Sequence, residues 1–219
     1  MSGARLLDGP PASAGMEPAG AHGQRLGALP RGGPGLVDVL ERSGLRGRGG
    51  ASFPVGTKWR TVTGRGGGAV VLVNGAEGEP LSHKDRVLMQ CRPHLVLDGA
   101  VLAAQTVGAD DVVLYIGEDH AGARAAMERA IAERGDERLR VRLVAAPARY
   151  VAGEETAAVH SVNEGVALPT STPPRPFERG VAGRPTLVQN VETLAHVALI
   201  ARFGDAWFRD GGRDGAVGT

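Results

Sequence analysis

A glycine-rich segment in the first third of the chain combines residue types suited to holding a flat or phosphorylated ligand. The stretch GLRGRGGASFPVGTKW (44–59) contains five glycines together with Phe53 and Lys58, one of only two lysines in the protein. Glycine allows close backbone approach to a ligand because it lacks a Cβ atom, so Phe53 is able to stack on a ring and Lys58 to face a phosphate. The alternative is an ordinary surface loop with Phe53 tucked into the core. The residue order matches neither a Walker phosphate loop nor a dinucleotide fingerprint after a strand.

A second polar motif follows the first expected strand. VNGAEGEP (73–80) places Asn74, Glu77 and Glu79 directly after the β-branched run at 69–74. Ligands of open α/β sheets bind at the carboxyl ends of strands, where these side chains could hydrogen-bond a ribose or the polar edge of a flavin. A solvated acidic turn is the alternative reading.

Two further motifs stand at expected helix starts. RYVAGEETAAV (149–159) follows a strand, and its GEET stretch either offers amides to an anion or is a plain acidic helix start stabilised by the helix dipole. GRPTLVQNVET (183–193) places Asn190 near a helix N-terminus, where capping is the simplest role.

The segments that must position these motifs alternate between buried strands and helices. Apolar runs without alternation indicate strands buried on both faces, and helices of about four turns between them indicate an α/β fold with a parallel sheet covered on both sides. Strands are expected at 69–74, 111–117 and 139–146, with helices at 35–45, 92–108, 121–135 and 191–204. Residues 1–34, rich in Gly, Pro and Ala, are expected to form a disordered tail.

Composition excludes several classes of function. Lysines and arginines (25) nearly balance acidic residues (24), which argues against a nucleic-acid surface. No apolar run approaches the roughly 20 residues of a membrane-spanning helix, and we expect no direct membrane insertion. The single cysteine, Cys91, is expected to be buried and inert, and the six histidines show no spacing typical of metal ligands. A cytoplasmic location follows by default because no secretory pattern opens the chain.

Taken together and in this order, the four motifs resemble the flavin-bearing, NADH-oxidising subunit of respiratory complex I and its relatives in NAD-linked formate dehydrogenases and hydrogenases. The matching stretches are GLRGRGGASFPVGTKW (44–59), NGAEGEPLSHKDR (74–86), RYVAGEETAAV (149–159) and PTLVQNVET (185–193).

This resemblance implies a Rossmann-like FMN- and NADH-binding domain over residues 35–208, with 209–219 beginning a following module. The residues it implies for FMN are Gly47, Gly49, Gly50, Lys58, Asn74, Glu77, Gly153, Glu154, Glu155 and Asn190, and those for the nucleotide are Phe53 and Glu79. The flavin itself performs the hydride transfer, so no catalytic side chain is expected. The implied partners are NAD(H) and iron–sulfur electron-transfer subunits, which would hold the chain at the periphery of a membrane.

Departures from the family pattern leave a second function open. Ala76 replaces an aspartate, Gln189 an asparagine and Ser52 a glycine, while Thr172 and Arg175 stand where the family has a lysine and a phenylalanine that help to hold NADH. The cysteines that bind [4Fe–4S] in full-length relatives are absent from these 219 residues, so we expect no cluster here. The alternative is a non-catalytic or donor-altered paralogue that serves as a flavin-binding or assembly module.

Overall fold

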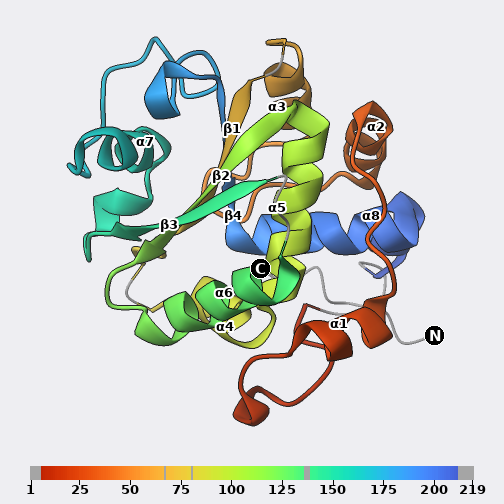
Figure 1. The fold of residues 1–219 in the computed structure, drawn as a ribbon. Helices are drawn as coiled ribbons and strands as arrows, with labels where there is room; N and C mark the ends of the chain where they lie inside the picture. The colour runs from red at the N-terminus through yellow and green to blue at the C-terminus, as the bar shows by residue number, and fades with distance from the viewer. Residues whose placement is uncertain (1–5, 67, 80, 136–138, 212–219) are drawn as a thin grey trace.

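A four-stranded parallel sheet forms the centre of the protein (Figure 1). The computed structural model describes residues 6–66, 68–79, 81–135 and 139–211. The strand order is β3-β2-β1-β4, and all three neighbouring pairs are parallel. The strands are β1 (Ala69–Gly75), β2 (Ala109–Gly117), β3 (Arg140–Ala146) and β4 (Thr186–Asn190).

Side chains of the central strand alternate between two separate apolar cores. Val71 and Val73 of β1 belong to the larger core, whereas Val70 and Leu72 belong to a smaller core on the opposite face. Successive residues of a strand point to opposite faces, so a strand that is apolar throughout must be covered on both sides. The predicted α/β fold, with helices on both faces of a parallel sheet, is confirmed.

Helices cover the two faces unequally (Figure 1). The smaller core is closed by α7 (Glu155–Glu164) and the short turn η3 (Val181–Gly183). The helices that contribute to the larger core are α2 (Pro34–Ser43), α3 (Val55–Thr63), α4 (Lys84–Cys91), α5 (Pro93–Val107), α6 (Ala121–Arg134) and α8 (Val191–Gly211), the last broken at Gly204.

The most buried helix is α5, which crosses α8 so closely that glycine is required at the contact. A Cβ atom added to Gly99 would lie 2.1 Å from the carbonyl oxygen of Leu194. Pro93 occupies the first turn of α5, as the sequence predicted, and a left-handed glycine, Gly108, ends the helix.

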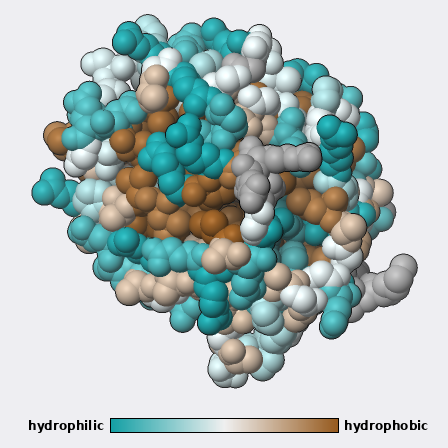
Figure 2. Space-filling model, in the orientation of Figure 1, coloured by the Kyte–Doolittle hydropathy of each residue, from teal (hydrophilic) through white to brown (hydrophobic). Residues whose placement is uncertain are grey.

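The outer edge of the sheet is open at β3, which pairs only with β2 among the described strands. Figure 2 shows apolar residues gathered near the centre of this side of the molecule. The partly buried Val141 and Leu143 of β3 pack against the larger core.

Residues 6–34 differ from the disordered tail that composition suggests. They include the short turn η1 (Ala12–Ala14) and helix α1 (Ala19–Leu26), which lies against α5 and α6. Glu17 and His22 of this segment are buried beside Arg25 and Asp98. Four apolar residues of the segment also pack against the larger core: Leu6, Met16, Leu26 and Leu29. Composition alone does not reveal this combination of buried polar pairs and a few placed apolar side chains, which explains the difference. Residues 1–5 of the expected tail lie outside the described part of the chain.

The sequence also led to expectations about the C-terminal domain boundary, Cys91, membrane-spanning helices and metal sites. The expected domain boundary at 208/209 falls inside α8, and residues 212–219 lie outside the described range. Cys91 is buried at the end of α4. Across the described residues, no helix is both long and apolar enough to cross a membrane, and no group of three or more potential metal ligands comes together.

Candidate functional site

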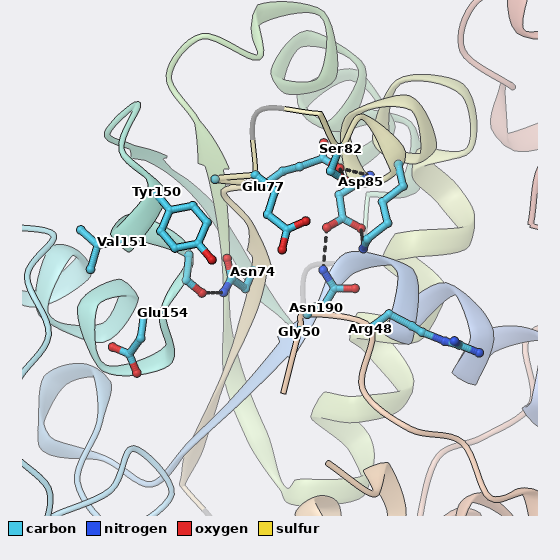
Figure 3. Close-up of a pocket in the computed structure, with 15 residues that line it drawn as sticks. Arg48, Gly50, Asn74, Glu77, Ser82, Asp85, Tyr150, Val151, Glu154 and Asn190 are labelled. Carbon is cyan, nitrogen blue, oxygen red and sulfur yellow. Dashed lines mark hydrogen bonds and ion pairs between the residues drawn. The ribbon is translucent and has the colours of Figure 1, made fainter. Parts of the chain in front are cut away.

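A cavity of about 370 Å³ opens at the carboxyl edge of the sheet (Figure 3). Four segments far apart in the sequence build it: the glycine loop, the turn after β1 with the start of α4, the short turn η2 (Tyr150–Gly153), and the end of β4. The predicted site residues that line it are Gly49, Gly50, Asn74, Glu77, Glu79, Gly153, Glu154 and Asn190.

The glycine loop is closed by a hydrogen bond between its own residues and is tied to the first turn of α8. The amide of Arg48 donates to Thr193 Oγ1 at 2.9 Å, and the Gly47 amide donates to the carbonyl of Phe53 at 2.9 Å. A Cβ atom at Gly49 would lie 3.3 Å from the Cβ of Asn190, which is tighter than nearly all such contacts. The bare backbone therefore allows the loop to lie directly against the strand end.

Glu77 holds the turn after β1 to the start of α4. One carboxylate oxygen accepts from Ser82 Oγ (2.7 Å) and the amide of Asp85 (2.9 Å), and the other accepts from the amide of Arg86 (3.0 Å). These amides belong to the first turn of α4, whose own preceding residue supplies no side-chain cap. Glu77 has φ +43°, a left-handed conformation that is costly for a residue other than glycine.

Asn74 joins the end of β1 to η2 on the other side of the cavity. Its Nδ2 donates to the carbonyl of Gly153 at 2.8 Å, while its Oδ1 accepts from the amide of Ala76 at 3.3 Å. Gly78 packs so closely on this segment that an added Cβ atom would lie 2.5 Å from the Tyr150 carbonyl oxygen. Figure 3 shows the Tyr150 ring directed toward the cavity from the side of η2.

A charged network forms the wall between α4 and α8. Asp85, only 2% exposed, accepts from Asn190 Nδ2 (2.6 Å), lies 3.0 Å from Lys84 Nζ, and accepts from the Glu192 amide (3.3 Å). Burial raises the pKa of the Asp85 carboxyl to about 6, although Lys84 and Asn190 oppose the shift. Lys84 also pairs with Glu192 at 3.1 Å. Burial would raise the pKa of Glu192, but His196 and Lys84 outweigh it and hold that pKa at about 2.

Four predicted site residues lie outside the cavity lining. Phe53 is 52% exposed, so the alternative that placed it in the core is wrong. Lys58 on α3 donates to Glu155 Oε2 at 2.8 Å, which pairs two of the predicted residues with each other. Gly47 lies at the base of the loop. Their roles toward a ligand stay predictions.

The helix start in the GEET motif forms as predicted, and its anion-binding amides are already engaged. The carboxylate of Glu154 accepts from the amides of Thr156 (2.9 Å) and Ala157 (2.8 Å) and caps α7. Asn190 likewise accepts from the amide of Thr193 at 3.3 Å, as expected for a cap.

Sequence reasoning missed seven lining residues, although the quoted motifs contain them all. They are Arg48, Gly78, Ser82, Lys84, Asp85, Tyr150 and Val151. Lys84 and Asp85 open α4, and the only sequence signal for them was their place inside the stretch NGAEGEPLSHKDR (74–86). The burial of Asp85 is visible only in the structure.

The sequence model of one protein family, the Nuo51 FMN-binding domain, matches residues 40–199. The chain belongs to this family. One relative, an NADH-quinone oxidoreductase subunit of Rhizobium meliloti (strain 1021), is 37% identical over 196 residues, covering 84% of this chain and 47% of the relative. The corresponding NADH-quinone oxidoreductase subunit of Rhodobacter capsulatus is 35% identical over 198 residues, with 84% and 46% covered.

A solved structure agrees with this family assignment. A chain of the NAD+-reducing [NiFe]-hydrogenase in the H2-reduced state superposes with a TM-score of 0.71 and 39% identity, covering 78% of this chain and 31% of that chain. This member of the FMN-binding family spans about half the length of the curated relatives it matches.

Proposed function

We propose that this chain binds FMN at the carboxyl edge of its sheet and serves as the NADH-oxidising flavin domain of a multisubunit oxidoreductase. The observation that carries the proposal is the convergence, at one cavity, of eight residues that the family motifs assign to the flavin or the nucleotide. When bound, the flavin supplies hydride acceptance from NADH and onward transfer of single electrons. A partner subunit with an iron–sulfur centre, at the periphery of a membrane in the cytoplasm, would take up those electrons.

The residues of the cavity fit a flat, polar-edged ring. Gly49 and Gly50 present backbone without side chains on one side, and Gly78 and Gly153 do so on the other. The volume of about 370 Å³ falls in the range of small-molecule sites, and the cavity is open to solvent beside Tyr150, which is 73% exposed. Asn74 and Asn190 supply amide groups that orient a ring, and Glu79 is exposed where a nucleotide would enter.

Flavin binding and turnover are tested by adding FMN to the purified chain and following its fluorescence, then adding NADH without oxygen and following flavin absorbance. Binding with bleaching supports the proposal, and a chain that leaves FMN fluorescence unchanged contradicts it. Gly49→Ala brings a Cβ atom within 3.3 Å of Asn190 and is expected to weaken FMN binding. Gly35→Ala on α2, where nothing lies within 4 Å, is the matched control and should bind as the parent does.

A second function, flavin binding without NADH turnover, is favoured by the substitutions at the nucleotide side. Thr172 and Arg175 replace the expected lysine and phenylalanine, and Ala76, buried beside the cavity, offers no carboxylate. FMN that binds and bleaches with dithionite but not with NADH or NADPH would support this function instead.

A further inference from the structure

Asp85 is hydrogen-bonded to the side-chain amide of Asn190. The family motifs assign Asn190 to the flavin but do not assign Asp85. The two side chains come from α4 and the end of β4, and Asn190 Nδ2 donates to Asp85 Oδ2 at 2.6 Å. The other Asp85 oxygen is already engaged by Lys84 Nζ and by the amide of Glu192. Both residues line the cavity (Figure 3).

We propose that Asp85 is a positioning residue whose ionisation sets the orientation of the Asn190 amide and, through it, the affinity of the site for flavin. The effect on flavin affinity rests on the proposed function. The orientation of the Asn190 amide does not, because it concerns the protein without ligand.

The hydrogen-bonding capacity of the two groups explains the control. An ionised carboxylate only accepts hydrogen bonds, so Asp85 requires Asn190 to direct its Nδ2 toward it, which leaves Oδ1 to accept from the Thr193 amide. Once Oδ2 carries a proton, it becomes a donor and favours Oδ1 as its partner. The amide then turns over, gives up the bond that its Oδ1 accepted from the Thr193 amide, and exchanges the donor and acceptor atoms that it presents beside the cavity.

The charges around Asp85 leave its carboxyl group able to gain or lose a proton. Lys84 from its own helix favours the ionised form, whereas Glu77 from the turn after β1 opposes it. The third carboxylate in contact with this network, Glu192 of α8, is occupied by Lys84 and His196 and lies 3.9 Å from Arg48 Nε. Among the described residues, Lys84 is the one cation that opposes the effect of burial on Asp85. The pKa of the carboxyl is therefore about 6, so that it changes between its neutral and ionised forms near neutral pH.

The Asn190 amide can be followed by NMR because the chain has only three asparagines, Asn74, Asn163 and Asn190. Its orientation is read from the nuclear Overhauser effect between the Asn190 Nδ2 protons and the Thr193 amide proton, which is expected to be strong at pH 5 and weak at pH 8. In the ligand-free protein labelled with ¹⁵N-asparagine, the side-chain signals of Asn190 are expected to move between pH 8 and pH 5 with a midpoint near 6. Asn163, bonded to Gly180 and Ala182, should stay fixed and acts as the internal control. In Asp85→Asn the Asn190 signals should no longer titrate. Movement that persists in this variant, or its absence in the parent, overturns the inference.

The effect on flavin is measured as the FMN dissociation constant of parent and Asp85→Asn across the same pH range. The phosphate of FMN also titrates near pH 6, so the informative quantity is the ratio of the two constants at each pH. This ratio is expected to change by about 5-fold between pH 8 and pH 5, the equivalent of one hydrogen bond. Asp38→Asn on the exposed side of α2 is the matched control and should give a constant ratio.

The outcomes separate the two proposals. FMN binding with a flat ratio overturns the role of Asp85 and leaves the flavin function standing. No binding at any pH rejects the flavin function and the affinity half of the inference, while the asparagine signals still decide whether Asp85 orients Asn190. A melting temperature for each variant shows whether it folds before its ratio is interpreted.

Discussion

Two aspartates, Asp85 and Asp98, are equally buried in this protein and behave in opposite ways. Each is 2% exposed, yet burial raises the pKa of Asp85 to about 6, whereas that of Asp98 is held at about 2. Burial also acts against the ionised form of Asp98, but three hydrogen-bonding partners outweigh it: His22 Nε2 at 2.8 Å, Arg134 Nη2 at 2.6 Å and Arg202 Nη2 at 2.6 Å.

The difference lies in the number of cations and in what they join together. The partners of Asp98 come from α1, α6 and α8, so one carboxylate ties the N-terminal segment to the body of the protein. Asp85 has one lysine and an amide, and it lies on the wall of a cavity. The first arrangement stabilises the fold, and the second holds a titratable group on the cavity wall at a cost in stability.

The largest expected effect is that of Asp98→Asn, which leaves the nearly inaccessible Arg202 side chain and the partly buried Arg134 without their anion. Removal of one partner from a buried ion pair typically costs about 3–5 kcal/mol, and we expect a loss of about 3 kcal/mol in the free energy of unfolding, measured with urea. The matched control is Asp38→Asn at the exposed pair with Arg60, which should leave the free energy of unfolding nearly unchanged. Equal losses at the two positions would contradict the role assigned to Asp98.

The pH dependence of this loss follows from the sign of the shift. The folded-state pKa of Asp98 is depressed, so the stability that it contributes is present above the ordinary value of about 4 and disappears as the pH falls toward 2. The difference between parent and Asp98→Asn should therefore shrink over that window.

Asp85→Asn is expected to act in the opposite direction. The folded-state pKa of Asp85 is raised, so the folded protein favours the neutral form, and ionisation destabilises it as the pH rises through about 6. The shift from 3.8 to about 6 corresponds to about 3 kcal/mol, so the variant should be more stable than the parent by up to about that amount at pH 8.

The gain should fade between pH 6 and pH 4, where Asp85 of the parent also becomes neutral. Urea unfolding at pH 8 and at pH 4 measures the two values. A variant that is less stable than the parent at pH 8 would show that the bonds to Lys84 and Asn190 outweigh burial.

Neither aspartate could be singled out from sequence alone, although the fold around them could be. The apolar runs of β1 and β2 and the helices α5 and α6 are periodic enough to define a parallel α/β sheet from their residues. The strand β4 was missed because its five residues, TLVQN, include two amides and lead directly into α8. Only the β1–β4 pairing, which aligns Asn74 with Asn190, makes it a strand.

The same limit applies to the site. Motif residues such as Asn74, Glu77 and Asn190 lie in order along the sequence, so their convergence follows once the parallel sheet is accepted. The charge state of Asp85 depends instead on which cations reach it in three dimensions. Likewise, the burial of His22 depends on Asp98, which is 76 residues away, a distance over which local patterns carry no information.

The smallest expected effect concerns backbone strain, which also distinguishes the two regions. Two of the three described non-glycine residues with positive φ, Ser52 and Glu77, lie on segments that border the cavity, and none lies in the segment that pairs with Asp98. Ser52 has φ +51° at a position where the family has glycine, so Ser52→Gly should relieve a left-handed conformation that costs about 1 kcal/mol, partly offset by the greater freedom of glycine in the unfolded chain.

A net gain of about 0.5 kcal/mol is therefore expected for Ser52→Gly, and its matched control is the adjacent Ala51→Gly. Ala51 does not adopt a positive φ, so that change adds freedom to the unfolded chain without relieving strain and should cost about 0.5 kcal/mol. Thermal unfolding of the two variants side by side measures effects of opposite sign. If both variants destabilise the protein equally, the loop over the cavity is not strained at Ser52. Glu77 would then be the one described residue whose strained backbone distinguishes the cavity from the region around Asp98.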